Sequence, residues 1–386
     1  MRKIMFHLNC LEQGGAERVV SNLANRLCRE DLEIVVTTEW EGVDEFQLDP
    51  RVKKLIVGPK ASDEKKSRIS KMYLRIKYLR DCIKEEKPDV VIAFTRKPIY
   101  RALQAAGKLN VPIIIAVRTD PTGHYEEMLD KIQIPWLFPR ASGAVFQTKG
   151  QRDFFPEYLR DVSTIILNPV SDKYLDVPKP VERENSIVQS GRLVDFKNQP
   201  MLIDAFMKVH AKHPEFELKI YGPDSFDGTK EILEAKIKEY QAEKFIHLMG
   251  GSDELEKQLP QSKIYAFSSD WEGLPNALIE AMALGMPIVA TDCPCGGPAT
   301  IMTDGYDGLL VPIKDPDALA EGIIKLIENP ELAEEYGMHA REIVKRVNSD
   351  AVIDEWRNYI DEVIQRCNSE KKHNLKKRLK KKKNNQ

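Results

Sequence analysis

Two acidic residues, Glu272 and Glu280, flank a turn and the helical residues that follow it in DWEGLPNALIEAMALGMPIVATD (270–292). Glycine and proline in the EGLP turn break the preceding strand, and Asn276 is a residue type that favours the start of a helix. The exposed amides of the first helical turn, with the positive end of the helix dipole, can bind phosphate. The segment therefore predicts a phosphate-binding turn with one carboxylate in the loop and one inside the helix.

These two carboxylates could alternatively be the catalytic pair of a glycoside hydrolase. Eight residues along a helix span about 12 Å, whereas hydrolase pairs need roughly 5 to 9.5 Å. Two separate contacts, one to a sugar and one to a ribose, suit the spacing better. A capped core helix with an incidental acid is the structural alternative, although Glu280 interrupts an otherwise apolar helix.

Two cations in SGRLVDFKN (190–198) follow another predicted strand. Arg192 offers a planar fork and Lys197 a point charge, and both suit a diphosphate. Such cations stabilise a departing diphosphate in the role that a metal ion would otherwise fill. Because Arg and Lys are common on protein surfaces, this pair indicates a phosphate site only in combination with the EGLPN turn. No D-x-D motif flanks a suitable strand, and we predict no catalytic metal ion.

A third candidate is the loop QGGAER (13–18), which follows the first predicted strand and opens a helix. Gly14 and Gly15 permit close backbone approach, and the helix N-terminus favours an anion. The pattern is not G-x-G-x-x-G, so a dinucleotide fingerprint is absent. A plain tight turn is the alternative interpretation.

Alternating strands and helices must position these loops. Val- and Ile-rich runs predict strands at 3–8, 33–38, 52–57, 89–94, 112–117, 143–148, 186–191, 216–222, 244–250, 263–269 and 287–292. Helical patterns separate most of them, which is typical of βαβ units and parallel sheets. We therefore predict an α/β protein with two Rossmann-like domains whose parallel sheets face each other across a cleft.

The predicted domain organisation has five parts. They are an N-terminal Rossmann-like domain (1–168), a proline-rich linker (169–185), a C-terminal Rossmann-like domain (186–347), a helix that packs back towards the N-terminal domain (348–367) and a disordered polybasic tail (368–386).

Composition excludes several classes of protein. With 42% apolar and 31% charged residues the chain is typical of a soluble globular protein. No apolar run reaches the ~18 residues of a membrane-spanning helix. The six cysteines contain no C-x-x-C pair, which argues against zinc and favours reduced thiols in the cytoplasm.

The basic segment at the chain's end suggests a membrane surface. Nine Lys or Arg and one acidic residue lie between 370 and 386, although the net charge of the whole chain is −2. Each cation near an anionic bilayer contributes about 1 kcal/mol, so Lys371–Lys383 predicts peripheral attachment to the inner face of the plasma membrane. Within 65–84, an apolar helical stripe has basic flanks, which fits either a core-facing helix with snorkelling lysines or an interfacial helix. The stripe consists of Ile69, Met72, Ile76, Leu79 and Ile83.

The segment EGLPNALIE (272–280) is similar to the E-x7-E signature of the retaining GT-B glycosyltransferases of family four, and SGRLVDFKN resembles their G-R-x5-K arrangement. The layout of that family covers residues 1 to about 366. The resemblance implies that Glu272 contacts the donor sugar and that Glu280 hydrogen-bonds the nucleotide ribose. It implies catalytic roles for Glu272, Arg192 and Lys197.

The resemblance also implies a wider set of binding residues. Donor-binding residues are Gly14, Gly15, Arg192, Lys197, Gly273, Leu274, Pro275, Asn276 and Glu280. Many relatives have a His near VRTDP (117–121), where this chain has Arg118 and Asp120, with His124 further on; these three become candidate acceptor residues.

The reaction that the resemblance implies is front-face substitution with retention, without a side-chain nucleophile and without a cofactor. GGAERVV and CPCGGP are similar to segments of bacterial enzymes that add N-acetylgalactosamine or a related hexose to undecaprenyl-diphosphate glycans. We therefore expect a UDP-sugar donor, a UDP-N-acetylhexosamine or UDP-galactose, and a lipid-linked glycan acceptor in surface polysaccharide or lipid-linked oligosaccharide synthesis.

Two other functions stay open at this point. A UDP-sugar epimerase of the same fold would also bind a nucleotide diphosphate. A non-enzymatic polybasic membrane or RNA adaptor explains the basic end but leaves the three loops unused. A nucleic-acid partner is not expected, because the basic end lacks interleaved aromatic residues.

Overall fold

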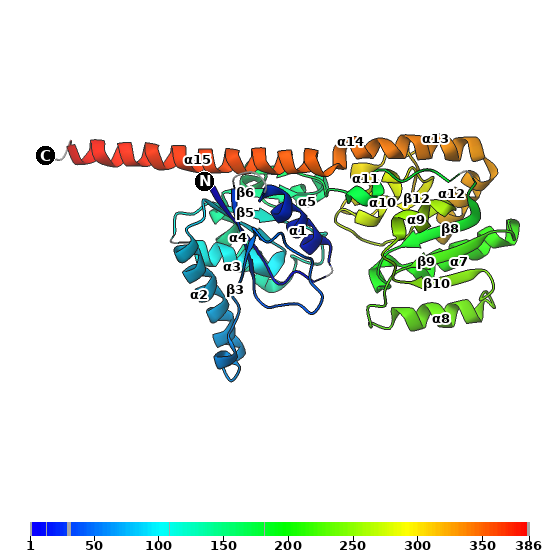
Figure 1. The fold of residues 1–386 in the computed structure, drawn as a ribbon, viewed down its shortest axis with the longest axis horizontal. Helices are drawn as coiled ribbons and strands as arrows, with labels where there is room; N and C mark the ends of the chain where they lie inside the picture. The colour runs from blue at the N-terminus through cyan, green and yellow to red at the C-terminus, as the bar shows by residue number, and fades with distance from the viewer. Residues whose placement is uncertain (1, 13, 29–31, 108, 181, 384–386) are drawn as a thin grey trace. The chain divides into compact units, whose positions relative to one another are not determined.

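The computed structural model describes residues 2–12, 14–28, 32–107, 109–180 and 182–383. Its contacts divide the chain into two compact units (Figure 1). The first comprises residues 1–147, 151–166 and 352–386, and the second comprises 148–150 and 167–351.

The first unit contains a seven-stranded parallel sheet in the order β3-β2-β1-β4-β5-β6-β7. The strands are β1 (Arg2–Leu8), β2 (Leu32–Thr38), β3 (Lys53–Ile56), β4 (Val90–Phe94), β5 (Ile113–Ala116), β6 (Gly143–Phe146) and β7 (Ser163–Ile165). The helices are α1 (Gly15–Leu27), α2 (Arg68–Glu86), α3 (Arg96–Ala106), α4 (Met128–Leu137), α5 (Lys149–Phe154), α6 (Glu157–Arg160) and α15 (Ser349–Lys383), of which α5 and α15 begin in the second unit.

Both faces of this sheet are buried, as expected for parallel strands. One face packs against α1 and α15, whose Trp356 stacks on Phe94 of β4 with 5.8 Å between ring centroids. The other face packs against α2, α3 and α4.

The second unit contains a six-stranded parallel sheet in the order β10-β9-β8-β11-β12-β13. The strands are β8 (Glu184–Ser190), β9 (Glu217–Tyr221), β10 (Ile246–Gly250), β11 (Ser262–Phe267), β12 (Ile288–Thr291) and β13 (Leu309–Val311). The helices are α7 (Gln199–Lys212), α8 (Thr229–Glu239), α9 (Leu255–Gln258), α10 (Asn276–Ala283), α11 (Gly297–Ile301), α12 (Pro316–Glu328), α13 (Pro330–Ala340) and α14 (Val344–Val347).

The predicted α/β class with two parallel-sheet domains is confirmed, and every predicted strand forms. The prediction missed the edge strands β7 and β13, which are only three residues long. Such short runs carry too little periodicity to be recognised.

Strand order places a topological switch point in the second sheet between β8 and β11. Chain order runs outward from this pair in both directions, so the loops that leave their carboxyl ends diverge and leave room for a ligand. Ile187 of β8 pairs with Ile264 of β11, and Val188 pairs with Tyr265. The loops that hold Lys197 and Glu272 follow these two neighbouring strands.

Two segments differ from the predicted organisation. Part of the expected linker belongs to the core of the second unit: Val170 and Tyr174 are buried, and the Val170 amide donates to the Val347 carbonyl at 2.9 Å. Its prolines interrupt regular structure without preventing these apolar side chains from packing.

In place of the disordered tail that we predicted from residue 368, α15 continues to Lys383. Lys, Leu and Arg are good helix formers, and extending an existing helix avoids the cost of nucleating a new one. Residues 384–386 lie outside the described part of the chain.

Candidate active site

The loops that follow β8 and β11 are hydrogen-bonded to each other. The Asp270 amide donates to the Phe196 carbonyl at 2.9 Å, and Ser268 Oγ donates to the Lys197 carbonyl at 2.8 Å. Asn198, which caps α7, donates through Nδ2 to Asp270 Oδ1 at 2.8 Å. These bonds hold the two predicted motifs in one fixed arrangement.

Lys197 and Glu272 meet at the centre of this arrangement. The Lys197 ammonium forms an ion pair with Glu272 Oε1, and the side chains are only 13% and 14% exposed. Ser269 Oγ lies 3.4 Å from the same carboxylate oxygen. The structure therefore brings together two of the residues that the sequence nominated from separate motifs.

Aromatic rings lie beside the Lys197 ammonium. Phe196 and Trp271 stack with their ring centroids 4.1 Å apart, and the Lys197 ammonium lies 5.6 Å from the ring centres of Phe196 and Phe267. Sequence reasoning missed Phe196 and Trp271, although each directly precedes a nominated residue. The rings of Phe196 and Phe267 restrict water around the ammonium and strengthen its interaction with an anion.

Glycines allow neighbouring loops to approach this site closely. A Cβ at Gly222, after β9, would lie 1.9 Å from the Gly191 carbonyl oxygen, and one at Gly297 would lie 2.1 Å from the Gly273 carbonyl oxygen. Gly191 itself has φ = +148°, a conformation that side chains disfavour. Four loops thus pack backbone against backbone around the ion pair.

The helix α10 begins at the predicted place, but its cap is not the expected one. Pro275 occupies the cap position without a side-chain hydrogen bond, and Asn276 is the first helical residue. The Asn276 Oδ1 atom accepts from Asn168 Nδ2 at 2.7 Å instead of capping the helix. The cap residue therefore provides no side-chain acceptor for the first-turn amides, which suits an external anion.

The remaining residues nominated in the second unit have different surroundings. Gly273, Leu274 and Pro275 are buried, and Glu280 is only 5% exposed within α10. Arg192 is exposed, and its carbonyl accepts from Gln199 Nε2 at 3.0 Å. Arg192 shares the loop of Lys197 but does not share its enclosure by aromatic rings.

The glycine loop nominated in the first unit lies at the start of α1. Gly14 is the cap residue of α1 and Gly15 is its first helical residue, with no side-chain hydrogen bond to the cap. A Cβ at Gly14 would meet Glu17 Oε2 at 2.2 Å. The preceding Gln13 lies outside the described residues.

The three candidate acceptor residues follow β5 in the first unit. The Arg118 guanidinium lies 5.3 Å from the ring centres of both Phe94 and Trp356, and burial lowers its pKa. Asp120 is buried and accepts the Thr122 amide at 2.9 Å, while His124 is partly exposed. Arg118 therefore packs in the core beside α15, a structural setting that its sequence position did not reveal.

Among the described residues, no group of three or more His, Cys, Asp or Glu side chains is arranged to hold a metal ion. In the same part of the chain, none of the helices combines the length and apolar character needed to cross a bilayer.

Two family models together match most of the chain. The model described as Glycosyltransferase Family 4 matches residues 13–173, and the model described as Glycosyl transferases group 1 matches residues 171–343. The second match contains the whole Lys197–Glu272 site.

Relatives of similar length occur in Campylobacter jejuni. One is a GalNAc-α-(1→4)-GalNAc-α-(1→3)-diNAcBac-PP-undecaprenol α-1,4-N-acetyl-D-galactosaminyltransferase, 27% identical over 89% of this chain and 93% of its own length. Another is an N-acetylgalactosamine-N,N'-diacetylbacillosaminyl-diphospho-undecaprenol 4-α-N-acetylgalactosaminyltransferase. It is 26% identical over 88% of this chain and 94% of its own length.

A solved structure with the same fold is that of Anabaena HepE in complex with UDP and glucose. It superposes with a TM-score of 0.78 at 18% identity and covers 94% of this chain and all of its own. At this identity the match establishes the fold alone.

Proposed function

Because the chain belongs to the glycosyltransferases that join a family 4 domain to a group 1 domain, with the GT-B fold, we propose that it transfers a hexose or N-acetylhexosamine from a UDP-sugar to a lipid-linked glycan. The observation that carries this proposal is the Lys197–Glu272 ion pair at the switch point of the second sheet. In this proposal Lys197 is the cation for the leaving diphosphate and Glu272 is the carboxylate that contacts the sugar.

The diphosphate binds Lys197, Arg192 and the first-turn amides of α10. As the bond between sugar and phosphate breaks, negative charge grows on the departing phosphate oxygen. The Lys197 ammonium stabilises this charge strongly because aromatic rings exclude water around it. These groups supply the electrostatic stabilisation for which other transferases use a metal ion, so the reaction proceeds without one.

Transfer occurs with retention at the anomeric carbon. The acceptor hydroxyl attacks from the side on which UDP leaves, a new C–O bond replaces the sugar–phosphate bond, and the departing phosphate oxygen takes the hydroxyl proton. Glu272 is held by Lys197, so we assign it to the sugar hydroxyls rather than to covalent attack. Glu280 binds the ribose from within α10.

The relatives support the choice of substrates. Two Campylobacter enzymes of similar length are named for transferring N-acetylgalactosamine to undecaprenyl-linked glycans, and HepE was solved with UDP. We therefore favour a UDP-N-acetylhexosamine or UDP-galactose as donor and an undecaprenyl-diphosphate-linked glycan as acceptor. Gly14 and Gly15 keep their assignment to donor binding, and Arg118, Asp120 and His124 are assigned to acceptor binding.

A lipid-linked acceptor requires the enzyme to reach a membrane, and exposed apolar residues of the first unit support peripheral attachment. Met128, Ile132 and Trp136 follow each other at intervals of four along α4, and all three are more than 60% exposed. On α2, Leu79 and Ile83 of the predicted stripe are buried, whereas Ile69 and Met72 are exposed beside basic residues. These faces, with the basic end of α15, suit an anionic bilayer on the cytoplasmic side.

The proposal is tested by incubating the purified protein with each UDP-sugar, with and without undecaprenyl-diphosphate glycans. We expect acceptor-dependent UDP release with one donor class, an α-linked product from an α-linked donor, and unchanged turnover in EDTA. Interconversion of the UDP-sugar without UDP release would instead identify an epimerase. Absence of UDP binding would exclude the donor site.

A further inference from the structure

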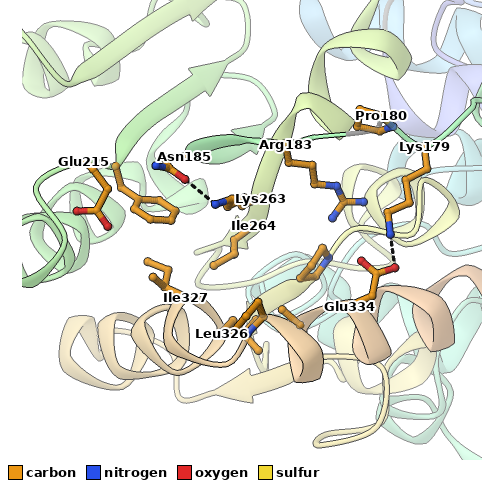
Figure 2. Close-up of a pocket in the computed structure, with 14 residues that line it drawn as sticks. Lys179, Pro180, Arg183, Asn185, Glu215, Lys263, Ile264, Leu326, Ile327 and Glu334 are labelled. Carbon is orange, nitrogen blue, oxygen red and sulfur yellow. Dashed lines mark hydrogen bonds and ion pairs between the residues drawn. The ribbon is translucent and has the colours of Figure 1, made fainter.

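A cavity of about 460 Å³ opens in the second unit away from the candidate active site (Figure 2). Asn185, Ile264 and Pro287 line it at the amino ends of β8, β11 and β12. The residues of the candidate site follow the carboxyl ends of the same sheet. A strand of the length of β8 spans roughly 23 Å, so the cavity cannot form part of that site.

Three cations line the cavity, and one of them is neutralised locally. Lys179 forms an ion pair with Glu334 on α13. Lys263 donates to the uncharged Asn185 Oδ1 at 2.6 Å, and its ammonium lies 5.7 Å from the ring centre of Phe216. Neither contact offsets the positive charge of Lys263.

Arg183 extends into the space between the strands and the α12–α13 pair (Figure 2). Its Nη2 donates to the Gly285 carbonyl at 3.1 Å, while its buried Nε has no hydrogen-bond partner among the described residues. Burial lowers the pKa of this guanidinium. An anion in the cavity that accepted from the exposed part of the guanidinium would offset the cost of burying its charge.

The other acidic residue of the lining, Glu215, does not neutralise Arg183 or Lys263. It is half exposed, and its carboxylate lies 3.4 Å from His213 Nδ1. Within the described part of the chain neither Arg183 nor Lys263 forms an ion pair with a carboxylate, so both present positive charge to the cavity, although the Glu334 carboxylate also acts on Arg183 electrostatically. Two positive charges match a phosphate monoester, which carries a charge near −2 at neutral pH, better than a monoanion.

The opposite wall is apolar. Ile264, Leu326 and Ile327 line it together with Pro287, Pro330 and Ala333. A volume of this size accommodates a small organic molecule. We propose that the cavity binds a small phosphate monoester, with its phosphate on Arg183 and Lys263 and an apolar substituent against this wall.

The test uses phenyl phosphate as a probe in titration calorimetry of the full chain, with inorganic phosphate and phenol as partial probes. We expect phenyl phosphate to bind more tightly than either partial probe, and saturating UDP to leave its affinity unchanged. Displacement by UDP would show that the probe occupies the donor site and would overturn the proposal. If inorganic phosphate bound as tightly as phenyl phosphate, the apolar wall would not contribute to binding, which would contradict this part of the proposal.

Substitutions then locate the site. Arg183→Gln should weaken phenyl phosphate binding about tenfold or more, the effect of losing a hydrogen bond to a charged group. Lys208→Gln, which removes an exposed cation of α7 paired with Asp317, should bind the probe normally. If Arg183→Gln fails to fold, Lys263→Gln tests the same phosphate contact. Unchanged affinity in a folded variant of either residue refutes the assignment.

Discussion

Lys197 and Glu272 lie 75 positions apart in the chain and form an ion pair in the second unit. Their strands, β8 and β11, are neighbours in the sheet although β9 and β10 intervene in sequence. Both side chains are largely shielded from water, so the pair is stronger than an exposed one. In the proposed function, a bound donor shares the Lys197 ammonium between its diphosphate and Glu272.

The proposed leaving-group role of Lys197 predicts a kinetic effect. Lys197→Ala should lower kcat by about 10²- to 10³-fold at saturating donor, as expected for the loss of one group that stabilises developing negative charge. Lys257→Ala removes an exposed lysine of α9 and should leave turnover unchanged. Full turnover by Lys197→Ala would show that the leaving group is stabilised elsewhere.

The ion pair predicts opposite effects of one substitution on product and substrate. Glu272→Gln removes the negative charge that competes for Lys197, so UDP should bind several-fold more tightly. The same change weakens contact with the donor sugar and should lower kcat/KM. Calorimetry with UDP and steady-state kinetics measure the two effects; UDP binding that weakens along with kcat/KM would contradict the competition.

The buried position of Glu280 predicts a defect in donor binding. Glu280→Ala should raise the donor KM about tenfold or more, with a smaller change in kcat, because a hydrogen bond to a charged group is lost. Glu321→Ala removes an exposed carboxylate of α12 and provides the control. A fall in kcat at constant KM would show that Glu280 acts in the chemical step rather than in donor binding.

The exposed face of α4 predicts a contribution to membrane binding. Ile132→Asp places a charge in this apolar face and should reduce flotation with vesicles that contain anionic lipid. Ile232→Asp makes the same change at an exposed isoleucine of α8 in the other unit. Equal flotation of the two variants would exclude α4 as a contact.

The basic end of α15 is tested separately. Deletion of residues 369–386 removes nine basic residues, each of which contributes about 1 kcal/mol near an anionic surface. We expect weaker flotation with anionic vesicles, greater salt sensitivity of the intact chain, and normal UDP binding by the truncated one. Unchanged flotation after the deletion would show that this segment does not contribute to membrane binding.

The burial of the His7 side chain predicts that the free energy of unfolding depends on pH. His7 is buried on β1, its Nδ1 lies 3.1 Å from Thr37 Oγ1, and burial lowers its pKa to about 3. Between pH 6.5 and 3 the unfolded chain binds a proton that the folded chain does not, so stability falls as the pH falls through this range. From pH 7 to pH 5 the loss is about 2 kcal/mol.

His7→Gln, which can keep a hydrogen bond to Thr37, should show a correspondingly smaller loss between pH 7 and pH 5. Urea unfolding at the two pH values measures the difference. An identical pH dependence in both proteins would mean that His7 is not the group responsible.

Local sequence patterns predicted much of the site because strand ends and turn residues are encoded over short distances. The EGLP turn and the start of α10 lie where the pattern placed them. Asn276 was expected to cap the helix, because residue preference does not contain information about the distant Asn168 that occupies its side chain. The burial of Val170 and the packing of Arg118 against aromatic rings depend in the same way on partners that are remote in the chain.

The sequence by itself determined the alternation of strands and helices, the α/β class and the residues that bear charge in each loop, since these depend on local periodicity and residue type. Only the tertiary structure decided that β8 lies beside β11, that Lys197 therefore meets Glu272, and that the rings of Phe196 and Phe267 lie near the Lys197 ammonium. Strand order arises from long-range packing of buried faces. No local pattern specifies which strand becomes the neighbour of another.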